Sequence, residues 1–255
     1  MKKLIEKNAD IIKLLNGELF DSGVNFDISN FSNKEIFSRI ESLLQITKNS
    51  NVIHIGCGDH LDLIDKKINN QTHLHSLLIE NSKKCIGFDI EDSSINHLKS
   101  QHNINNVYSA DVTDKEFKFS KFSNDKDWDF IVLGEIIEHI DNPVQFLSSI
   151  KENFSSCAKE ILVTAPNAYS WSHVLSYSQN QIELINSDHR FWFTPYTILK
   201  ILVKSNIQIN DLYFADPVIN RKKRILNKIL KLFKSSEQVY LPSHLSSTLI
   251  VRGFI

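Results

Sequence analysis

The sequence predicts an α/β fold built around a mostly parallel sheet. Short apolar runs alternate with amphipathic stretches along the chain, and no internal repeat or low-complexity linker interrupts the alternation. Such alternation is typical of βαβ units, in which parallel strands are joined by helices. The 255 residues are enough for one large α/β domain or for a domain with an appendage.

The segment before residue 50 is predicted to be helical. Residues 2–16 place apolar side chains at helical spacing and Gly17 can end that helix. A second helix is expected over residues 33–44. We therefore expect residues 1–48 to form an N-terminal helical extension or lid, and residues 49–255 to form the main domain.

Seven apolar runs are predicted to be strands. They lie at residues 52–55, 85–88, 107–109, 130–133, 161–164, 207–214 and 248–255. Helices are predicted over amphipathic stretches at residues 73–81, 93–100, 144–154 and 195–204. Strands buried on both faces have such continuous apolar runs, because helices cover both sides of a parallel sheet.

Composition and charge exclude several classes of protein. The net charge is −1 with 23% charged residues, so no overall field directs the chain to nucleic acid or membrane. Three scattered cysteines are too few for a disulfide framework or a zinc site, and reduced cytosolic thiols are the simpler interpretation. The first residues lack the apolar core of a signal peptide, and no stretch has the roughly 20 apolar residues that span a bilayer. We expect a soluble, cytoplasmic protein.

The turns after the first three predicted strands carry residues suited to a nucleotide. Gly56 and Gly58 allow the backbone to approach a ligand closely, although a tight turn without function would look the same. Asp89 follows the second strand, where an acid can accept hydrogen bonds from a ribose diol, and Asp111 follows the third. Leu61 stands where the dinucleotide fingerprint has its last glycine, which counts against a dinucleotide.

The stretch of residues 128–143 carries the most informative polar side chains. Its apolar run stops at Gly134. Glu135, Glu138 and His139 follow, at the carboxyl end of the predicted strand, where open α/β sheets bind ligands. Spacings of three and four residues allow one helical turn to bring these side chains together. Two neighbouring carboxylates repel each other, and a cation or the protonation of one of them relieves the repulsion.

Three roles stay open for this stretch. Carboxylate and imidazole ligands suit Mg, Mn, Fe, Co or Zn, and a bound metal would lower the pKa of a hydroxyl nucleophile. Without a metal, His139 could act as a general base or a hydrogen-bond partner. The residues could also only shape the turn.

Four motifs together resemble a known family. GCGDH, CIGFDI, YSADVTD and DFIVLGEIIEHIDNP occur in the order and spacing of the class I S-adenosylmethionine-dependent methyltransferases, over about residues 50–215. The resemblance implies a Rossmann-like, seven-stranded, mostly parallel sheet in which TLIVRGFI is the last, antiparallel strand. It also implies S-adenosylmethionine as the cofactor.

The same resemblance implies which residues hold the cofactor. The two glycines would face its methionine part. Asp89 would hold the ribose hydroxyls, and Asp111 with the backbone of Val112 would read the adenine edge. The full cofactor-binding set is Gly56, Cys57, Gly58, Asp89, Ile90, Asp111, Val112, Gly134 and Glu135.

Two narrower resemblances suggest an acceptor. GEIIEHIDNP, ILVTAPNAYSW and INSDHRFWFTP resemble bacterial methyltransferases of surface and capsular polysaccharide biosynthesis. This implies a hydroxyl of a sugar or phosphate-type decoration, such as O-methyl phosphoramidate, on a nucleotide-linked sugar or glycan precursor. E-x-x-E-H with the later D-H-R-F also resembles the small-RNA 3′-terminal 2′-O-methyltransferases, in which two Glu and two His bind a divalent metal. The matching residues, which are also the candidate catalytic residues, are Glu135, Glu138, His139 and His189.

Aromatic residues surround His189 in the sequence. Trp192 and Phe193 can form an apolar wall that excludes water from an acceptor site. Asn167, Tyr169 and Trp171, after the fifth strand, either line the same mouth or belong to the core.

A basic amphipathic helix is predicted over residues 218–236. Seven cations fall between Arg221 and Lys234, and apolar residues among them form one stripe at helical spacing. The helix could pack on the core with a solvated face, or contact an anionic membrane surface, a phosphate-bearing acceptor or RNA. A pI near 6.8 and the lack of an RNA-binding module weigh against nucleic acid.

The sequence thus predicts a methyltransferase that positions a small acceptor and removes its proton. RNA 2′-O-methylation is the alternative activity. A non-catalytic binding protein that keeps the fold is a third alternative. Its one supporting feature is His54, which stands where the family usually carries Asp or Glu. With histidine at this position, the residue that would bind the cofactor's amino group is not identified.

Overall fold

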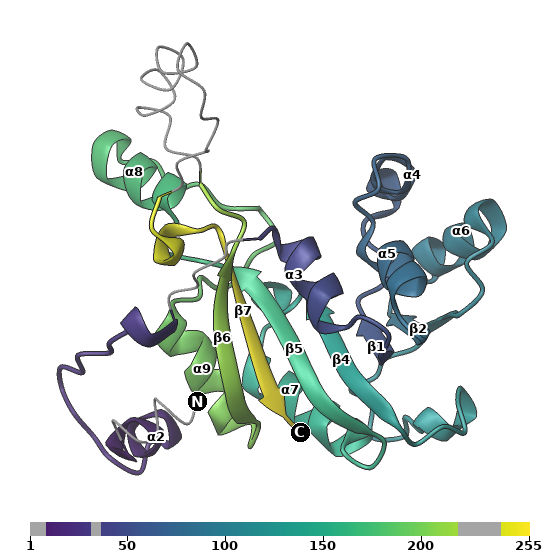
Figure 1. Ribbon diagram of the computed structural model, residues 1–255, viewed down its shortest axis with the longest axis horizontal. Coiled ribbons are helices and arrows are strands. Elements are labelled where there is room, and N and C mark those ends of the chain that lie inside the picture. The colour runs from purple at the N-terminus through teal and green to yellow at the C-terminus, as the bar shows by residue number, and fades with distance from the viewer. Residues whose placement is uncertain (1–8, 32–36, 219–240) are drawn as a thin grey trace, which may run out of the picture.

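A seven-stranded sheet organises the structure. The computed structural model describes residues 9–31, 37–218 and 241–255. The strands are β1 (Asn51–Ile55), β2 (Lys84–Asp89), β3 (Val107–Ser109), β4 (Trp128–Gly134), β5 (Ala158–Pro166), β6 (Gln208–Ala215) and β7 (Thr248–Phe254). Their order is β3-β2-β1-β4-β5-β7-β6, and β7 runs antiparallel to both of its neighbours (Figure 1). Neighbours from β3 to β5 pair in parallel. The predicted mixed sheet is confirmed, and each predicted run coincides with one strand.

Both faces of the sheet are buried. On the central strand β4, Ile131 belongs to the largest apolar cluster and its neighbour Val132 to a second cluster. Ile161 and Leu162 of β5 alternate in the same way. Because successive side chains of a strand point to opposite faces, this pattern requires cover on both sides of the sheet.

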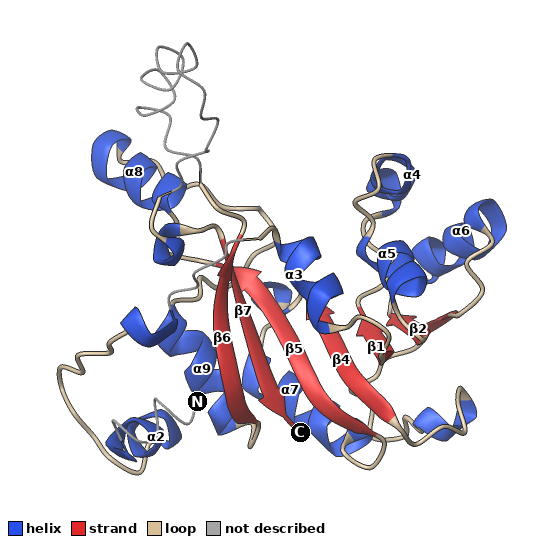
Figure 2. Cartoon of the chain, viewed as in Figure 1, coloured by secondary structure: helices blue, strands red, loops and turns tan. Residues whose placement is uncertain are grey.

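Helices supply that cover (Figure 2). They are α2 (Ala9–Asn16), α3 (Arg39–Ile46), α4 (Leu61–Asn69), α5 (Leu74–Asn81), α6 (Asp92–His102), α7 (Pro143–Phe154), α8 (Trp171–Asn180) and α9 (Pro195–Lys204). The largest cluster takes its helical side chains from α2, α7 and α9, and the second takes them from α3 and α5. A third cluster joins α4 to α6 through Ile64, Ile95 and Leu98.

The sequence does not predict α4 or α8, and it misplaces the start of α3. In α4 only Ile64 is buried and in α8 no residue is, so neither helix shows a wide apolar stripe. Residues 33–36 lie outside the described residues, and the predicted helix over 33–44 is interrupted at Ser38, which is extended and forms a capping box with Glu41. Reciprocal side-chain to main-chain hydrogen bonds of 3.2 and 2.9 Å join these two residues, so the helix begins at Arg39.

Helix α2 is anchored to the main core. Ile11 and Leu15 are buried in the largest apolar cluster. The Nζ of Lys200 in α9 donates to the carbonyl of Leu14 at 3.2 Å. Helix α2 therefore packs on α9, and the role of residues 1–48 as a separate extension or lid stays a prediction.

Two other predicted helices also extend outside the described residues. The basic helix predicted at 218–236 lies almost wholly within residues 219–240, which are not described. The first helix is predicted to begin at residue 2, whereas the description begins at residue 9. At the border of the former segment, the N–H of Leu241 donates to the carbonyl of Val218 at 3.0 Å. Among the helices that the structure describes, none combines the length and the apolar character needed to cross a membrane.

Candidate active site

The carboxyl ends of β1, β2, β4 and β5 meet at one edge of the sheet. The register places Ile55 beside Phe88 and Leu133, and it places Leu133 beside Val163. The turns that follow these strands therefore lie together, and they carry most of the candidate site residues.

The turn after β1 is a tight glycine loop held against β2. Gly56 has a φ of +75°, which side chains rarely adopt, and a Cβ at this position would overlap Cδ1 of Ile136. The N–H groups of Gly56 and Cys57 donate to the carbonyl of Phe88, at 2.8 and 3.2 Å. Only glycine fits at position 56, because the backbone conformation disfavours a side chain and Ile136 fills the space beside it.

Asp89 braces the same loop. Its Oδ2 accepts the N–H of Gly58 at 2.8 Å, and its Oδ1 accepts the N–H of Glu91 at 3.0 Å. Its neighbour Ile90 is 77% exposed. The Asp89 carboxylate, which main-chain hydrogen bonds hold in place, can bind a polar part of a ligand. The exposed side chain of Ile90 beside it can contact a flat apolar part.

Asp111 and Val112 form the turn after β3. The Oδ1 of Asp111, which is exposed, accepts the N–H and the hydroxyl of Thr113 at 2.9 and 2.6 Å. Val112 is buried, and its carbonyl accepts from the side-chain amide of Asn153 in α7 at 2.8 Å. Asn153, which the sequence does not single out, fixes this turn.

The turn after β4 holds Glu135 in a left-handed conformation. Its φ is +60°, which costs a non-glycine residue roughly 1–2 kcal/mol. Thr164 of β5 holds it there. The N–H of Glu135 donates to Thr164 Oγ1 at 2.9 Å, and that hydroxyl donates to Glu135 Oε1 at 3.1 Å. Burial raises the pKa of the Glu135 carboxyl, and the positive charge of Arg39 opposes the rise.

Arg39 reaches this turn from the start of α3. Its guanidinium ends close to Gly134: a Cβ atom added to this glycine would lie 3.3 Å from Arg39 Nη1. The same added atom would lie 3.8 Å from His54 Nε2. The main-chain N–H of Arg39 donates to Asp216 Oδ1 at 2.9 Å, which ties the start of the helix to the loop after β6. Within the described ranges, the guanidinium forms no salt bridge. A cationic group that the sequence does not single out is therefore available at the edge of the sheet.

Glu138, His139 and His189 converge beside the same turn. One ligand atom from each lies within 4.8 Å of the others, and His189 Nε2 is 3.9 Å from Glu138 Oε1. The centres of the two imidazole rings are 4.7 Å apart, and the rings are nearly perpendicular. The N–H of Arg190 donates to the carbonyl of Glu138 at 2.7 Å, so the loop that carries His189 is held to the 3₁₀ turn Ile137–His139.

The cluster combines a buried carboxyl with two imidazoles. Glu138 is fully buried, and neither of its oxygens has a hydrogen-bond partner among the described residues. Burial, with the charge of nearby Glu135, raises the pKa of Glu138 to about 8. Burial lowers the pKa of both His139 and His189. A buried carboxyl beside neutral imidazoles is a place where a proton or a cation can be bound.

Glu135 does not share one helical turn with the other two residues of its motif. It precedes the 3₁₀ turn in a left-handed conformation, so the helical spacing that would align it with Glu138 and His139 is absent. Its carboxylate accepts from Thr164, and it is not one of the three residues whose ligand atoms converge. The structure thus brings three of the four predicted ligands together, with Glu135 nearby.

A cavity of about 540 Å³ opens beside the cluster. It is lined by Glu135, Pro166, His173, Glu183, Leu184, Ile185, Asn186, His189, Trp192, Ser247 and Thr248. Trp192 forms part of the predicted aromatic wall. Its ring centre is 4.4 Å from that of His173, and its indole N–H donates to Glu183 Oε1 at 2.8 Å. His173, which the sequence does not single out, therefore helps to shape this cavity.

Two neighbours of this wall serve the core instead. Phe193 is buried in the largest apolar cluster. Asn167 is fully buried, and its side-chain amide donates to the carbonyls of His244 and Ser246 at 3.1 and 2.8 Å. Neither residue lines the cavity, and neither does Trp171.

His54 lies between the candidate site and the core. Its Nδ1 is 3.3 Å from the Nδ1 of His75, and the two rings stack with centres 5.4 Å apart. Burial lowers the pKa of His54 well below its usual range and that of His75 to about 3. An uncharged imidazole therefore occupies the position that the family resemblance associates with an acid.

Comparisons with known proteins concern the family and the fold. A family model described as a methyltransferase domain matches residues 26–211. An S-adenosylmethionine-dependent methyltransferase of Thermotoga maritima has 12% sequence identity and a TM-score of 0.52, with 100% of this chain and 99% of that chain covered. One from Archaeoglobus fulgidus has 17% identity and a TM-score of 0.49, with 85% and 91% covered. The methyltransferase domain of bacterial CtHen1 has 16% identity and a TM-score of 0.49, with 85% and 97% covered. No curated protein matches the chain.

Proposed function

Because the chain belongs to the methyltransferase-domain family, we propose that it transfers a methyl group from S-adenosylmethionine to a hydroxyl of a sugar or phosphate-type decoration on a glycan precursor. The observation that carries the proposal is the cluster of Glu138, His139 and His189 beside a cavity at the carboxyl edge of the sheet. Methyl transfer to a hydroxyl requires the positioning of two reactants and the removal of one proton. The cavity serves the first requirement and the cluster the second.

The residues at this edge fit the cofactor. The turn at Gly56, which packs against Ile136 with no space for a side chain, is the backbone we assign to the methionine part. Each oxygen of Asp89 accepts one main-chain hydrogen bond and can accept a second from a ribose hydroxyl. Ile90 offers its exposed side chain to the adenine face, and the carboxylate of Asp111 is accessible to the adenine amino group. When bound, the cofactor supplies an electrophilic methyl group on a sulfonium.

Arg39 is the residue we assign to the carboxylate of the methionine part. Its guanidinium lies beside Gly134, at the edge where the glycine turn also ends. A guanidinium binds a carboxylate through paired, charge-assisted hydrogen bonds. His54, whose Nε2 is buried near the same glycine without a described partner, is the residue we assign to the amino group, to which it would bond without contributing charge.

Deprotonation of the acceptor is assigned to His189. This residue lines the cavity, and its lowered pKa keeps the imidazole neutral with a lone pair available near pH 7. As the new O–C bond forms and the S–C bond breaks, the hydroxyl proton passes to His189. Glu138 Oε1 lies 3.9 Å from His189 Nε2, and its ionised form, which becomes the major one above its raised pKa of about 8, stabilises the imidazolium.

The same three side chains would also hold a divalent metal ion. An unpartnered carboxylate and two neutral imidazoles are a donor set suited to Mn, Fe, Co or Zn. Such an ion would supply Lewis acidity toward the acceptor hydroxyl. In that case the three residues would act as ligands, and activity would depend on the metal.

RNA 2′-O-methylation is a second candidate. It is favoured by the convergence of Glu138, His139 and His189, three of the residues that match the metal ligands of the small-RNA enzymes. A net charge of −1 gives no general attraction to an RNA backbone, so we rank this acceptor below a glycan precursor.

A methyl-transfer screen tests the proposal. The full chain is incubated with isotopically labelled S-adenosylmethionine and with nucleotide-linked sugars, small RNAs or phenols, with chelator and with added divalent metal. We expect label in a sugar acceptor, and label in RNA alone would favour the second candidate. Absence of heat on titration with S-adenosylhomocysteine would contradict both.

A further inference from the structure

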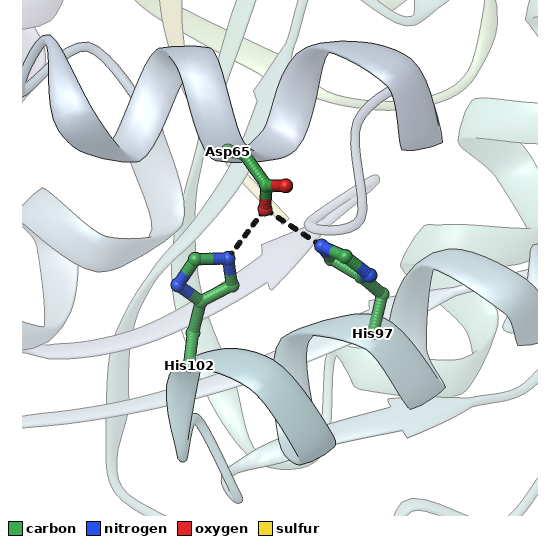
Figure 3. A group of neighbouring side chains, drawn as sticks. All are labelled: Asp65, His97 and His102. Atoms are coloured by element: carbon green, nitrogen blue, oxygen red, sulfur yellow. Dashed lines mark hydrogen bonds and ion pairs between the residues drawn. The ribbon is translucent and has the colours of Figure 1, made fainter.

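A second cluster of titratable side chains lies away from the candidate active site, on the outer side of α4 and α6. Asp65 points from α4 toward α6, and His97 and His102 point from α6 toward it (Figure 3). His97 Nε2 is 2.7 Å, and His102 Nε2 2.8 Å, from the same oxygen, Asp65 Oδ1. Three candidate ligand atoms from two helices therefore meet at one point.

We infer that Asp65, His97 and His102 form a zinc-binding site that joins α4 to α6. Two imidazole nitrogens and one carboxylate oxygen are a three-residue set that Zn²⁺ takes in proteins, with water as the fourth ligand. Mg²⁺ and Ca²⁺ prefer oxygen ligands alone, and Cu⁺ prefers sulfur. Cu²⁺ and Ni²⁺ also bind imidazole but favour square-planar or tetragonal sites, whereas three residues and one water suit the tetrahedral coordination of Zn²⁺, so zinc is the ion we assign.

The geometry requires only a small adjustment for an ion to enter. Around a tetrahedral Zn²⁺ with bonds of about 2.0–2.2 Å, neighbouring ligand atoms lie roughly 3.3 Å apart. The side chain of Asp65 is 62% exposed and those of His97 and His102 are 25% and 19% exposed, so the ion can enter from solvent. Because the Asp65 side chain is largely exposed, it can rotate to open the two hydrogen bonds.

The site would strengthen an existing contact between the two helices. Below it, Ile64 packs with Ile95 and Leu98 in a buried apolar cluster. At the amino-terminal end of α6, the hydroxyl of Ser94 donates to the carbonyl of Asp59 at 3.0 Å. A zinc ion on the outer side would add a third connection, between the middle of α4 and the second half of α6.

The alternative is a surface ion pair in which one carboxylate oxygen accepts from two imidazoles. Zinc titration distinguishes the two interpretations, provided that the Glu138 cluster cannot take up the ion. The parent protein for the test is therefore the full chain with His189→Ala. It is treated with chelator, dialysed, and titrated with Zn²⁺ by calorimetry and with Co²⁺ by visible absorption.

We expect the parent to bind one equivalent of Zn²⁺, to show tetrahedral Co²⁺ bands, and to unfold at a higher temperature with Zn²⁺ present. Adding His97→Ala and His102→Ala should weaken Zn²⁺ binding by roughly 100-fold or more. Asp65→Asn, which keeps the size of the side chain but removes its charge, should also weaken it. His60→Ala removes an exposed histidine just before α4 and should leave the affinity unchanged.

Two results would overturn the inference: no Zn²⁺ binding by the parent, or equal affinity in the parent and the double histidine variant. Circular dichroism shows whether each variant is folded. If the double variant does not fold, the affinity of Asp65→Asn decides the question, with equality to the parent counting against the site.

Discussion

Thr164 and Glu135 are joined by two hydrogen bonds that cross from β5 to the turn after β4. The N–H of Glu135 donates to Thr164 Oγ1 at 2.9 Å, and the hydroxyl returns a hydrogen bond to Glu135 Oε1 at 3.1 Å. The pair holds Glu135 at a φ of +60°, between the glycine loop and the Glu138 cluster. A single threonine on a neighbouring strand thus fixes the shape of the turn that separates the proposed cofactor and acceptor sites.

Replacing Thr164 by valine should loosen this turn. Thr164→Val keeps the shape of a fully buried side chain but leaves both Glu135 groups without their partner, which should lower the free energy of unfolding by about 1–3 kcal/mol. Urea denaturation measures this loss, and calorimetry with S-adenosylhomocysteine should show weaker binding. Thr164→Ser retains the hydroxyl and should stay close to wild type in both measurements.

A substitution at Gly56 should abolish cofactor binding through the backbone. Gly56→Ala introduces a Cβ at a φ of +75° and against the side chain of Ile136. The double variant with Ile136→Ala removes the overlap but keeps the backbone strain, so it should recover binding only in part. Equal calorimetric affinity in the wild type and Gly56→Ala would contradict a close approach of the cofactor to this turn.

The His54 and His75 pair should make the fold sensitive to acid. Both imidazoles have lowered pKa values in the folded chain, about 3 for His75, whereas in the unfolded chain they titrate near 6.5. Below about pH 6.5 the unfolded state therefore binds more protons, and the free energy of unfolding falls by up to about 1.4 kcal/mol per pH unit for each histidine. Above that pH this contribution is constant.

Urea unfolding between about pH 7.5 and pH 5 measures this slope. His75→Gln should reduce it by the contribution of one histidine. His60→Gln, at an exposed position, is the matched control and should keep the wild-type slope. The same slope in His75→Gln as in the wild type would show that the buried pair does not cause the acid sensitivity.

Arg39 should contribute to cofactor affinity from outside the recognised motifs. Arg39→Ala removes the cation beside Gly134, and loss of a charged hydrogen bond should weaken S-adenosylhomocysteine binding by roughly 10- to 100-fold. Arg39→Lys should retain part of the affinity. The hydrogen bond to Asp216 uses the main chain and persists in both variants, so a change in affinity reports the side chain.

The strands could be predicted because burial on both faces leaves a continuous apolar signal. The runs around Val132 and Leu162 need no tertiary information to be recognised. Helix α8 could not be predicted in this way, because none of its residues is buried. The start of α3 depends on a capping box at Ser38 that lies inside a run predicted as helix.

The site was predictable where its residues follow strands directly in the chain. Gly56, Asp89 and Glu138 belong to this class, because parallel strands bring their carboxyl ends together. Arg39 and Thr164 do not, since each acts on a turn far from it in sequence. The convergence of Asp65 with two histidines of α6 likewise depends on helix packing, which no short spacing reveals.

The central claim is that His189 removes the acceptor proton in a methyl-transfer reaction. Its most direct test is the turnover of His189→Gln on the acceptor found in the screen, measured with and without divalent metal and alongside His244→Gln as a control. We predict that turnover falls by roughly 10²–10⁴-fold in His189→Gln while the affinity for S-adenosylhomocysteine stays the same. Turnover equal to that of the wild type would contradict the claim.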